Sequence, residues 1–225
     1  MKRILSTKRL QPDQHRILTE GGLKVVHYNA IRIVPKAFTL PDQMEYTLFT
    51  SQHTVALFLK KKPVLSGQQK HLKAFCVGEK TARMLEKNGI DVLHVESYAA
   101  DLAAFIICHY AHVHIDFFCG SKRRDTLPTA FERHRISFRE IQLYQTMEVP
   151  VHWTDCFDAI LFFSPSGVQS FLRKNKPAQS CLAVCIGHTT AGEALSFFPA
   201  DQVKIAQSTS VESVLARTIE LMRTP

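Results

Sequence analysis

Residues 158–172 read DAILFFSPSGVQSFL, and this stretch decides the fold class. The segment from Ala159 to Phe163 is apolar and aromatic throughout, which predicts a strand covered on both faces, as in a parallel sheet. Apolar residues between Val168 and Leu172 recur at helical spacing, so a helix follows directly. The turn Ser164-Pro165-Ser166-Gly167 therefore lies at the carboxyl end of a strand, where open α/β sheets bind ligands.

The same pattern occurs twice in the chain. Residues 47–59 read TLFTSQHTVALFL, and aligning Ser51 with Ser164 gives an offset of 113 residues. Two further matches follow in the same order: CVGEKTA at 76–82 with CIGHTTA at 185–191, and apolar helical positions in 102–106 with those in 215–219. The period is too long for a solenoid, so the repeated unit is a domain.

The composition indicates a globular protein with two cores. The chain has 225 residues, of which 45% are hydrophobic, and this suits two compact α/β domains. No apolar run reaches the roughly 18 residues of a membrane span, and residues 1–6 become polar too early for a signal peptide. We expect a soluble cytoplasmic protein with no membrane partner.

The cysteines and histidines do not form a recognisable metal or disulfide pattern. None of the six cysteines belongs to a CxxC pair, and several lie in apolar strand-like runs, where a free thiol behaves as a small hydrophobe. The closest histidine group, His109, His112 and His114, lacks evident facing ligands. We expect no metal.

The charge predicts an anionic partner or none. The formal net charge is +8 and the pI is about 9.3. The densest basic groups, Lys60–Lys62 and Lys122–Arg124, are short, and no RNP-like aromatic motif or basic arm is present, so nucleic acid is not the expected partner. A polyanionic small molecule explains the positive charge as well as a nucleic acid would.

Strands and helices alternate along the chain, which is typical of parallel sheets wrapped by helices. The block from Tyr46 to Leu143 alternates strictly and ends in a strand expected at 137–143, whereas the C-terminal block has too few strands for a sheet of its own. The two N-terminal strands complete it. We therefore expect a discontinuous domain of residues 1–35 plus 147–225 and an inserted domain of residues 36–146, with linkers near 30–38 and 143–151.

Four hydroxyl side chains lie where strands give way to helices: Ser51, Thr81, Ser164 and Thr190. Helix capping alone explains this placement. The alternative is functional, because the free N–H groups and dipole of a helix N-terminus bind carboxylates or phosphates. The matching positions in both halves favour a shared anion site.

Residues 117–127 read FFCGSKRRDTL, a strand, a turn at Gly120 and a basic helix start that includes Arg124. The spacing is not that of a nucleotide-binding loop. It suits either a solvated basic surface or a carboxylate clamp. Tyr144, just before the second linker, is either a core tyrosine or a hydrogen-bond donor. No catalytic triad, paired carboxylates or activated cysteine is evident, so the chemistry needs little side-chain assistance.

Six segments, taken in chain order, resemble the uroporphyrinogen-III synthase family: LFTSQHTV, CVGEKTARML, FCGSKRRDTLPTAF, IQLYQT, FFSPSGV and IGHTTAGEAL. The resemblance covers almost the whole chain. It implies two flavodoxin-like parallel-sheet α/β domains joined by a two-stranded linker, with the first domain discontinuous.

The resemblance also implies the reaction, that of a cofactor-free lyase of haem (tetrapyrrole) biosynthesis. Hydroxymethylbilane (preuroporphyrinogen), a linear octacarboxylate, loses water and closes to uroporphyrinogen III with ring D inverted. Because this substrate also closes without an enzyme to the wrong isomer, catalysis is expected to be mainly conformational. The resemblance further implies a monomer that receives its substrate by transient hand-over from hydroxymethylbilane synthase.

The resemblance assigns roles to individual residues. Tyr144 matches a catalytic tyrosine that assists departure of the hydroxyl. The substrate-binding positions that it implies are Ser51, Thr81, Gly120, Arg124, Ser164, Ser166, Gly167, Thr189 and Thr190. The chain departs from the family pattern at His53-Thr54 (usually Asn-Ala), Lys8-Arg9 (Arg-Pro), Arg135 (Gly) and Thr209-Ser210 (Pro-Thr).

Two competing hypotheses remain. A nucleic-acid-binding protein would be retained on a DNA or RNA column with steep salt dependence. The other is a non-catalytic two-domain protein that binds an anionic small molecule. It is motivated by the absence of a catalytic dyad in the sequence.

Overall fold

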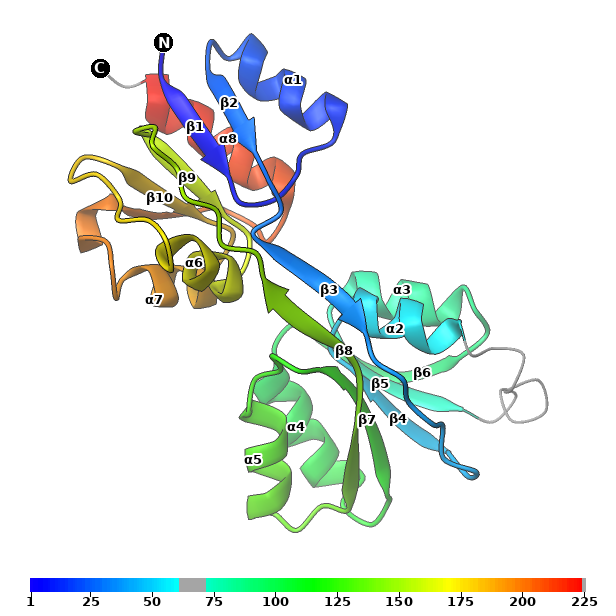
Figure 1. Cartoon of the computed structure of the whole chain (residues 1–225). Helices are drawn as coiled ribbons and strands as arrows, with labels where there is room; N and C mark the ends of the chain where they lie inside the picture. Colours follow the sequence, from blue (N-terminus) through cyan, green and yellow to red (C-terminus); the bar gives the residue numbers. More distant parts are fainter. Residues whose placement is uncertain (61–71, 224–225) are drawn as a thin grey trace. The chain divides into compact units, whose positions relative to one another are not determined.

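The computed structural model of the chain describes residues 1–60 and 72–223 (Figure 1). Lys61 and Lys62 of the first basic group lie outside the described residues. Contacts within the chain divide it into two units, Met1–Arg32 with Met147–Pro225, and Ile33–Thr146. Each unit is built on one sheet.

The first unit contains a five-stranded sheet in the order β11-β10-β9-β1-β2, and every neighbouring pair is parallel. Its elements are β1 (Arg3–Ser6), α1 (Pro12–Glu20), β2 (Lys24–His27), β9 (Ala159–Phe162), α6 (Pro165–Leu172), β10 (Leu182–Cys185), α7 (His188–Ala194), the 3-10 helix η3 (Ala200–Gln202), β11 (Val203–Ile205) and α8 (Val211–Arg223).

The second sheet has six strands in the order β3-β8-β7-β4-β5-β6, with the pairs from β8 to β6 parallel. Its elements are β3 (Ile31–Pro35), β4 (Tyr46–Phe49), α2 (Gln52–Leu59), β5 (Lys73–Val77), α3 (Glu79–Glu86), β6 (Asp91–Glu96), α4 (Ala99–His109), β7 (Ile115–Gly120), α5 (Thr126–Arg133) and β8 (Phe138–Glu148). The expected α/β fold with parallel sheets is confirmed.

Strand β9 shows why the opening stretch forms a central strand. All four of its residues are buried, and they alternate between two cores. Ile160 and Phe162 pack with side chains of α6 and α7, whereas Ala159 and Leu161 pack with side chains of α1 and α8. Helices therefore cover both faces of the first sheet. Truncating Phe162 to alanine would cost about 3–5 kcal/mol, the usual penalty for a buried aromatic side chain.

The two copies of the internal repeat form strands and helices that occupy corresponding positions in the two sheets. Residues 47–59 form β4 and α2, and residues 158–172 include β9 and α6. The second match pairs β5-α3 with β10-α7, and the third pairs α4 with α8. In the second sheet, side chains of α2 and α3 pack on one face and those of α4 and α5 on the other.

Strand β8 is longer than expected. The sequence predicts a strand over 137–143 and then a linker, but β8 continues to Glu148. The reason is its neighbour β3: the Lys36 N–H donates to the Leu143 carbonyl at 2.9 Å, and the Val149 N–H donates to the Ala30 carbonyl at 2.8 Å. The residue number rises along β3 as it falls along β8, so the two strands are antiparallel.

Arg135, which replaces a usual glycine of the family pattern, has a left-handed backbone with φ of 56°. It follows the C-terminus of α5, where the Arg135 N–H donates to Glu132 and the Ile136 N–H donates to Phe131. Such helix-ending turns favour glycine, because a Cβ is strained in this conformation.

All six cysteines are free thiols, and four of them are buried. Burial is the main cause that raises the pKa of Cys76, Cys181 and Cys185 to about 12 and that of Cys119 to about 11. In the described ranges, no three His, Cys, Asp or Glu side chains are placed to hold a metal ion, and no helix is long and apolar enough to cross a membrane.

Candidate functional site

In each sheet, the strand order reverses direction at one place. In the first sheet β2 lies on one side of β1 and β9 on the other, and in the second β5 and β7 lie on the two sides of β4. Ligands of open α/β sheets bind outside the carboxyl ends of the strands at such reversals. Thr7 and Ser121 directly follow the ends of β1 and β7, and Ser164 and Ser51 lie two residues beyond the ends of β9 and β4.

Ser51 caps α2 at the end of β4. Its backbone is extended, and its Oγ accepts a hydrogen bond from the Thr54 N–H at 3.2 Å. The first N–H groups of a helix have no partner within the helix, and the described residues give no acceptor to those of Gln52 and His53. Two donors at the positive end of the helix dipole therefore remain open for an anion.

Ser164 repeats this arrangement at the end of β9. Its Oγ accepts from the Gly167 N–H at 3.1 Å, and Pro165, which has no N–H, begins α6. The N–H of Ser166 is thus the open donor of this turn among the described groups. Thr7, which the sequence did not indicate, lies beside it: its hydroxyl donates to the Leu161 carbonyl at 2.7 Å, and a Cβ on Gly167 would lie 3.5 Å from that hydroxyl oxygen.

The expectation that Thr81 and Thr190 cap their helices is wrong. The capping positions are Gly78 and Gly187, and each threonine is the third residue of its helix. Both threonines are almost fully buried, with 4% and 3% exposed. Gly78 has φ of 88°, which a residue with a Cβ rarely adopts, so a threonine cannot easily take its place. Thr189, by contrast, is exposed in the first turn of α7.

Tyr144 and Gly120 are brought into direct contact. Parallel pairing of β7 and β8 places them opposite each other, after a shift of register between Cys119 and Gly120. A Cβ on Gly120 would lie 2.3 Å from Cζ and 2.7 Å from the hydroxyl oxygen of Tyr144. The absence of a side chain at position 120 therefore leaves the space that the phenol occupies.

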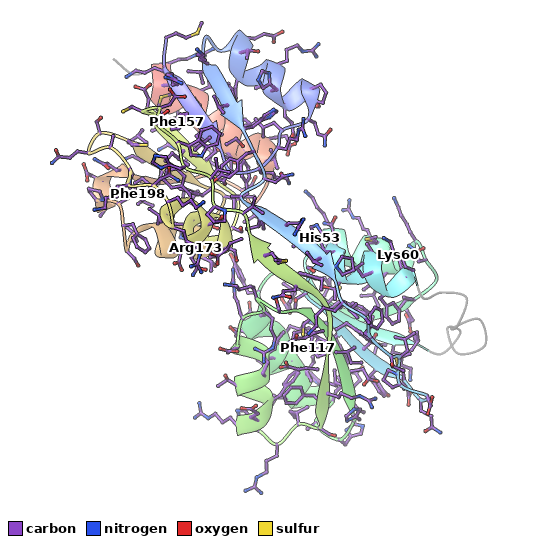
Figure 2. The ribbon with its side chains drawn as sticks, in the orientation of Figure 1. His53, Lys60, Phe117, Phe157, Arg173 and Phe198 are labelled. Atoms are coloured by element: carbon purple, nitrogen blue, oxygen red, sulfur yellow. The ribbon has the colours of Figure 1, made fainter. Side chains whose placement is uncertain are left out.

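His53 also lies beside Tyr144, and sequence reasoning missed this neighbour. The two ring centroids are 6.3 Å apart. His53 is exposed in the first turn of α2 (Figure 2), two residues after the cap Ser51. The one sequence feature that could have pointed to His53 as a site residue is its departure from the family pattern. Ser51, His53, Gly120 and Tyr144 thus form one group in the second unit.

The basic group at 122–124 was expected at a helix start, but it lies in the loop between β7 and α5, because α5 begins only at Thr126. Its two arginines have different roles. Arg123 makes ion pairs with Glu140, at 2.6 Å, and with Asp125, and its pKa is raised chiefly by its hydrogen bond to Glu140. Arg124 is exposed and has no ion pair with any residue in 1–60 or 72–223. Arg124, the predicted substrate-binding residue, is therefore the one of the two that is open to an incoming anion.

The chain was also compared with known protein families and known proteins. A sequence model of the family "Uroporphyrinogen-III synthase HemD" matches residues 13–216. No curated protein matches the chain in sequence.

Solved structures include two similar proteins. Uroporphyrinogen-III synthetase from Helicobacter pylori is 18% identical with a TM-score of 0.71, covering 98% of this chain and 100% of that one. A mutant uroporphyrinogen III synthase from Thermus thermophilus is 13% identical with a TM-score of 0.70, covering 100% of both chains. The likeness to these structures establishes the fold, and the family match covers most of the sequence: the chain belongs to the uroporphyrinogen-III synthase family.

Proposed function

We propose that the chain catalyses the family reaction, closing hydroxymethylbilane to uroporphyrinogen III with inversion of ring D and loss of water, in haem biosynthesis. The observation that carries this proposal is the family match over residues 13–216. The net charge of +8 suits a substrate with eight carboxylates.

We propose that the two units are domains with boundaries near residues 35–36 and 146–147, joined by the antiparallel strands β3 and β8. Numbered in chain order within the first unit, the strands run 2-1-3-4-5, the order of flavodoxin-like folds. In the second unit, β4 to β8 are numbered 1 to 5 in chain order. Read across the sheet from β6, their order is 3-2-1-4-5, which is also a doubly wound order. The flavodoxin-like description therefore suits the first unit more closely than the second.

Substrate carboxylates would bind to the open N–H groups at the start of α2 and α6, close to Ser51, Ser164, Ser166 and Gly167. Such sites hold an anion without a cationic side chain, since the helix dipole and the N–H groups both favour negative charge. The side chain of Arg124 would supply a further, charge-assisted contact. We propose Thr81, Thr189 and Thr190 as neighbouring substrate positions.

Tyr144 would act as the hydrogen-bond donor to the departing hydroxyl. A phenol is a donor at neutral pH, and Gly120 leaves its ring room at the end of β7. The substrate is reactive enough to close unaided, so the protein's main contribution would be to hold the chain in the conformation in which ring D attacks through its substituted carbon. No cofactor is required by this route.

The decisive experiment couples the purified protein to hydroxymethylbilane synthase, oxidises the products and separates the uroporphyrin isomers by chromatography. The proposal predicts mainly isomer III. Formation of isomer I alone, the uncatalysed product, would leave only the hypothesis of a non-catalytic anion-binding protein. We further propose a cytoplasmic monomer that accepts substrate by transient hand-over, and sedimentation of the protein with and without hydroxymethylbilane synthase tests the last two points.

A further inference from the structure

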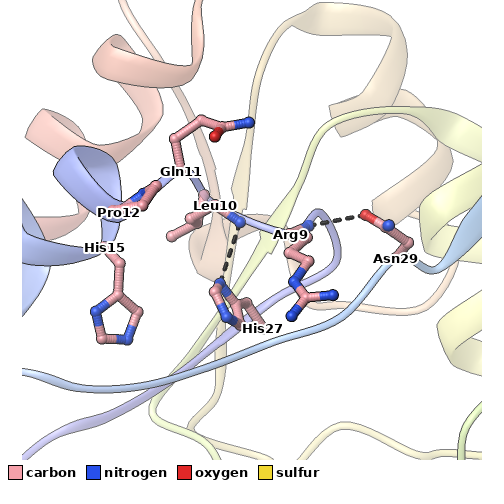
Figure 3. A pocket seen from close by; sticks show the side chains of 7 residues that line it. All are labelled: Arg9, Leu10, Gln11, Pro12, His15, His27 and Asn29. Atoms are coloured by element: carbon pink, nitrogen blue, oxygen red, sulfur yellow. Dashed lines mark hydrogen bonds between the residues drawn. The ribbon is translucent and has the colours of Figure 1, made fainter.

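We propose that a hollow beside α1 in the first unit is a subsite for one carboxylate of the tetrapyrrole, bound by Arg9, His15, His27 and Asn29. The hollow has a volume of about 770 Å³ and lies between the β1–α1 loop, the first turn of α1 and the end of β2 (Figure 3). The identity of the ligand rests on the proposed function, whereas the affinity for an oxyanion follows from the hollow itself.

The side chains of His27 and Asn29 can each donate or accept hydrogen bonds, and a backbone N–H occupies the accepting atom of each. The Leu10 N–H donates to Nδ1 of His27 at 3.1 Å, so the proton of the neutral imidazole is on Nε2. The Arg9 N–H donates to Oδ1 of Asn29 at 2.9 Å, so the amide NH₂ of Asn29 is turned away from that bond. The hollow thus presents an N–H of His27 and an NH₂ of Asn29, and both donate.

The ionisable side chains that line the hollow are all bases. Arg9, His15 and His27 line it, and none of the lining residues in 1–60 or 72–223 is acidic. The pKa of His27 is lowered first by burial and then by the nearby positive charges of His15 and Arg9. Two acids of the neighbouring helices do not line the hollow: Asp13 is exposed in the first turn of α1, and Glu212 of α8 accepts a hydrogen bond from the Gln14 side chain.

The hollow lies at the same sheet edge as the Ser164 turn. The Ala30 N–H, one residue beyond Asn29, donates to the Thr7 carbonyl at 2.9 Å, and Thr7 packs against Gly167. Arg9 follows Thr7 by two residues. A flexible polyacid that places one carboxylate at the Ser166 N–H therefore has a second anion-binding site, one that contains the cation of Arg9, at the same end of the same sheet.

The first test measures binding without turnover. The Cε1–Hε1 NMR signals of His15 and His27 are followed while acetate, or inorganic phosphate, is added to the whole protein. We expect acetate to shift both histidine signals saturably, and we expect these shifts to disappear in Arg9→Gln and in Asn29→Asp. Asn29→Asp keeps the Oδ1 acceptor but replaces the donating NH₂ by an oxygen that only accepts and carries negative charge. The matched control is Arg16→Gln, which removes one cation from α1 outside the hollow.

The second test measures catalysis. Arg9→Gln should raise KM for hydroxymethylbilane about tenfold, as expected for loss of a charge-assisted contact, with kcat within about twofold. Arg16→Gln should leave both constants unchanged. Thermal unfolding of each variant checks the fold, and the backbone bond of Arg9 to Asn29 does not require the arginine side chain.

The outcomes separate the hypotheses. Unchanged histidine signals with both anions, or an unchanged KM in Arg9→Gln, would overturn the proposal. Shifts with phosphate but not with acetate would make the hollow a phosphate site and overturn the carboxylate assignment. If the protein yields only isomer I but acetate still shifts the two histidine signals, the proposed function fails while the oxyanion site stands.

Discussion

The phenol ring of Tyr144 occupies the space where Gly120 would carry a Cβ, 2.3 Å from Cζ of the tyrosine. The two residues are 24 positions apart and meet because β7 and β8 pair side by side with a shift of register. Position 120 therefore determines where the hydroxyl of Tyr144 can lie.

Gly120→Ala should displace the ring, because real Cβ atoms do not come within 3.0 Å of such neighbours. We expect turnover to fall about tenfold or more, since misplacing a reacting group by about 1 Å can cost up to one hundredfold. Steady-state rates with hydroxymethylbilane measure this. Gly192→Ala is the control, because a Cβ there meets nothing within 4 Å and should leave the rate unchanged.

Tyr144→Phe removes the donor but keeps the ring. If the hydroxyl assists departure of water, kcat should fall roughly one hundredfold while KM changes little, as for the loss of a contact made mainly in the transition state. An unchanged kcat would remove Tyr144 from the mechanism. The fraction of isomer III, measured in the same assay, shows whether folding of the substrate is retained.

Arg135→Gly should stabilise the protein. The left-handed φ of 56° costs a residue with a Cβ about 1–2 kcal/mol, and the extra chain entropy of glycine in the unfolded state offsets part of this gain. We expect a net gain of about 0.5–1 kcal/mol in the free energy of unfolding, measured in urea. Arg133→Gly, at the last residue of α5, should instead lose stability, by up to about 1 kcal/mol.

Substitutions of the adjacent residues Arg123 and Arg124 should have different effects, the first on stability and the second on substrate binding. Arg123→Gln leaves Glu140 without its ion-pair partner, and since both side chains are largely shielded we expect a loss of about 1 kcal/mol in stability. Arg124→Gln should leave stability unchanged and raise KM a few-fold. Equal KM values for Arg124→Gln and the unmodified protein would contradict its proposed role.

The cysteines should divide into two classes in alkylation. Only the thiolate reacts, and burial raises the pKa of Cys76, Cys181 and Cys185 to about 12 and that of Cys119 to about 11. With iodoacetamide at pH 8, mass spectrometry should find label on the exposed Cys108 and Cys156 alone, and on all six in urea. Rapid labelling of Cys185 in the folded protein would show that its strand opens.

Much of the fold could be predicted because its signals are local. The apolar run at 159–163, the serines before α2 and α6 and the repeat offset of 113 residues each depend on neighbours in the chain, and helices and strands form at these places. The extension of β8 to Glu148 could not be predicted, because it depends on hydrogen bonds with β3 more than 100 residues earlier.

The sequence by itself determined the alternation of strands and helices, the two capped helix starts and the positive charge, since periodicity, capping and composition act at short range or over the whole chain. Only the tertiary structure decided which side chains meet. It placed Tyr144 on Gly120 through a shift of register, paired Arg123 rather than Arg124, buried Thr81 and Thr190, and brought His27 beside Arg9. Such contacts follow from strand pairing across long separations, where one residue of shift changes every partner.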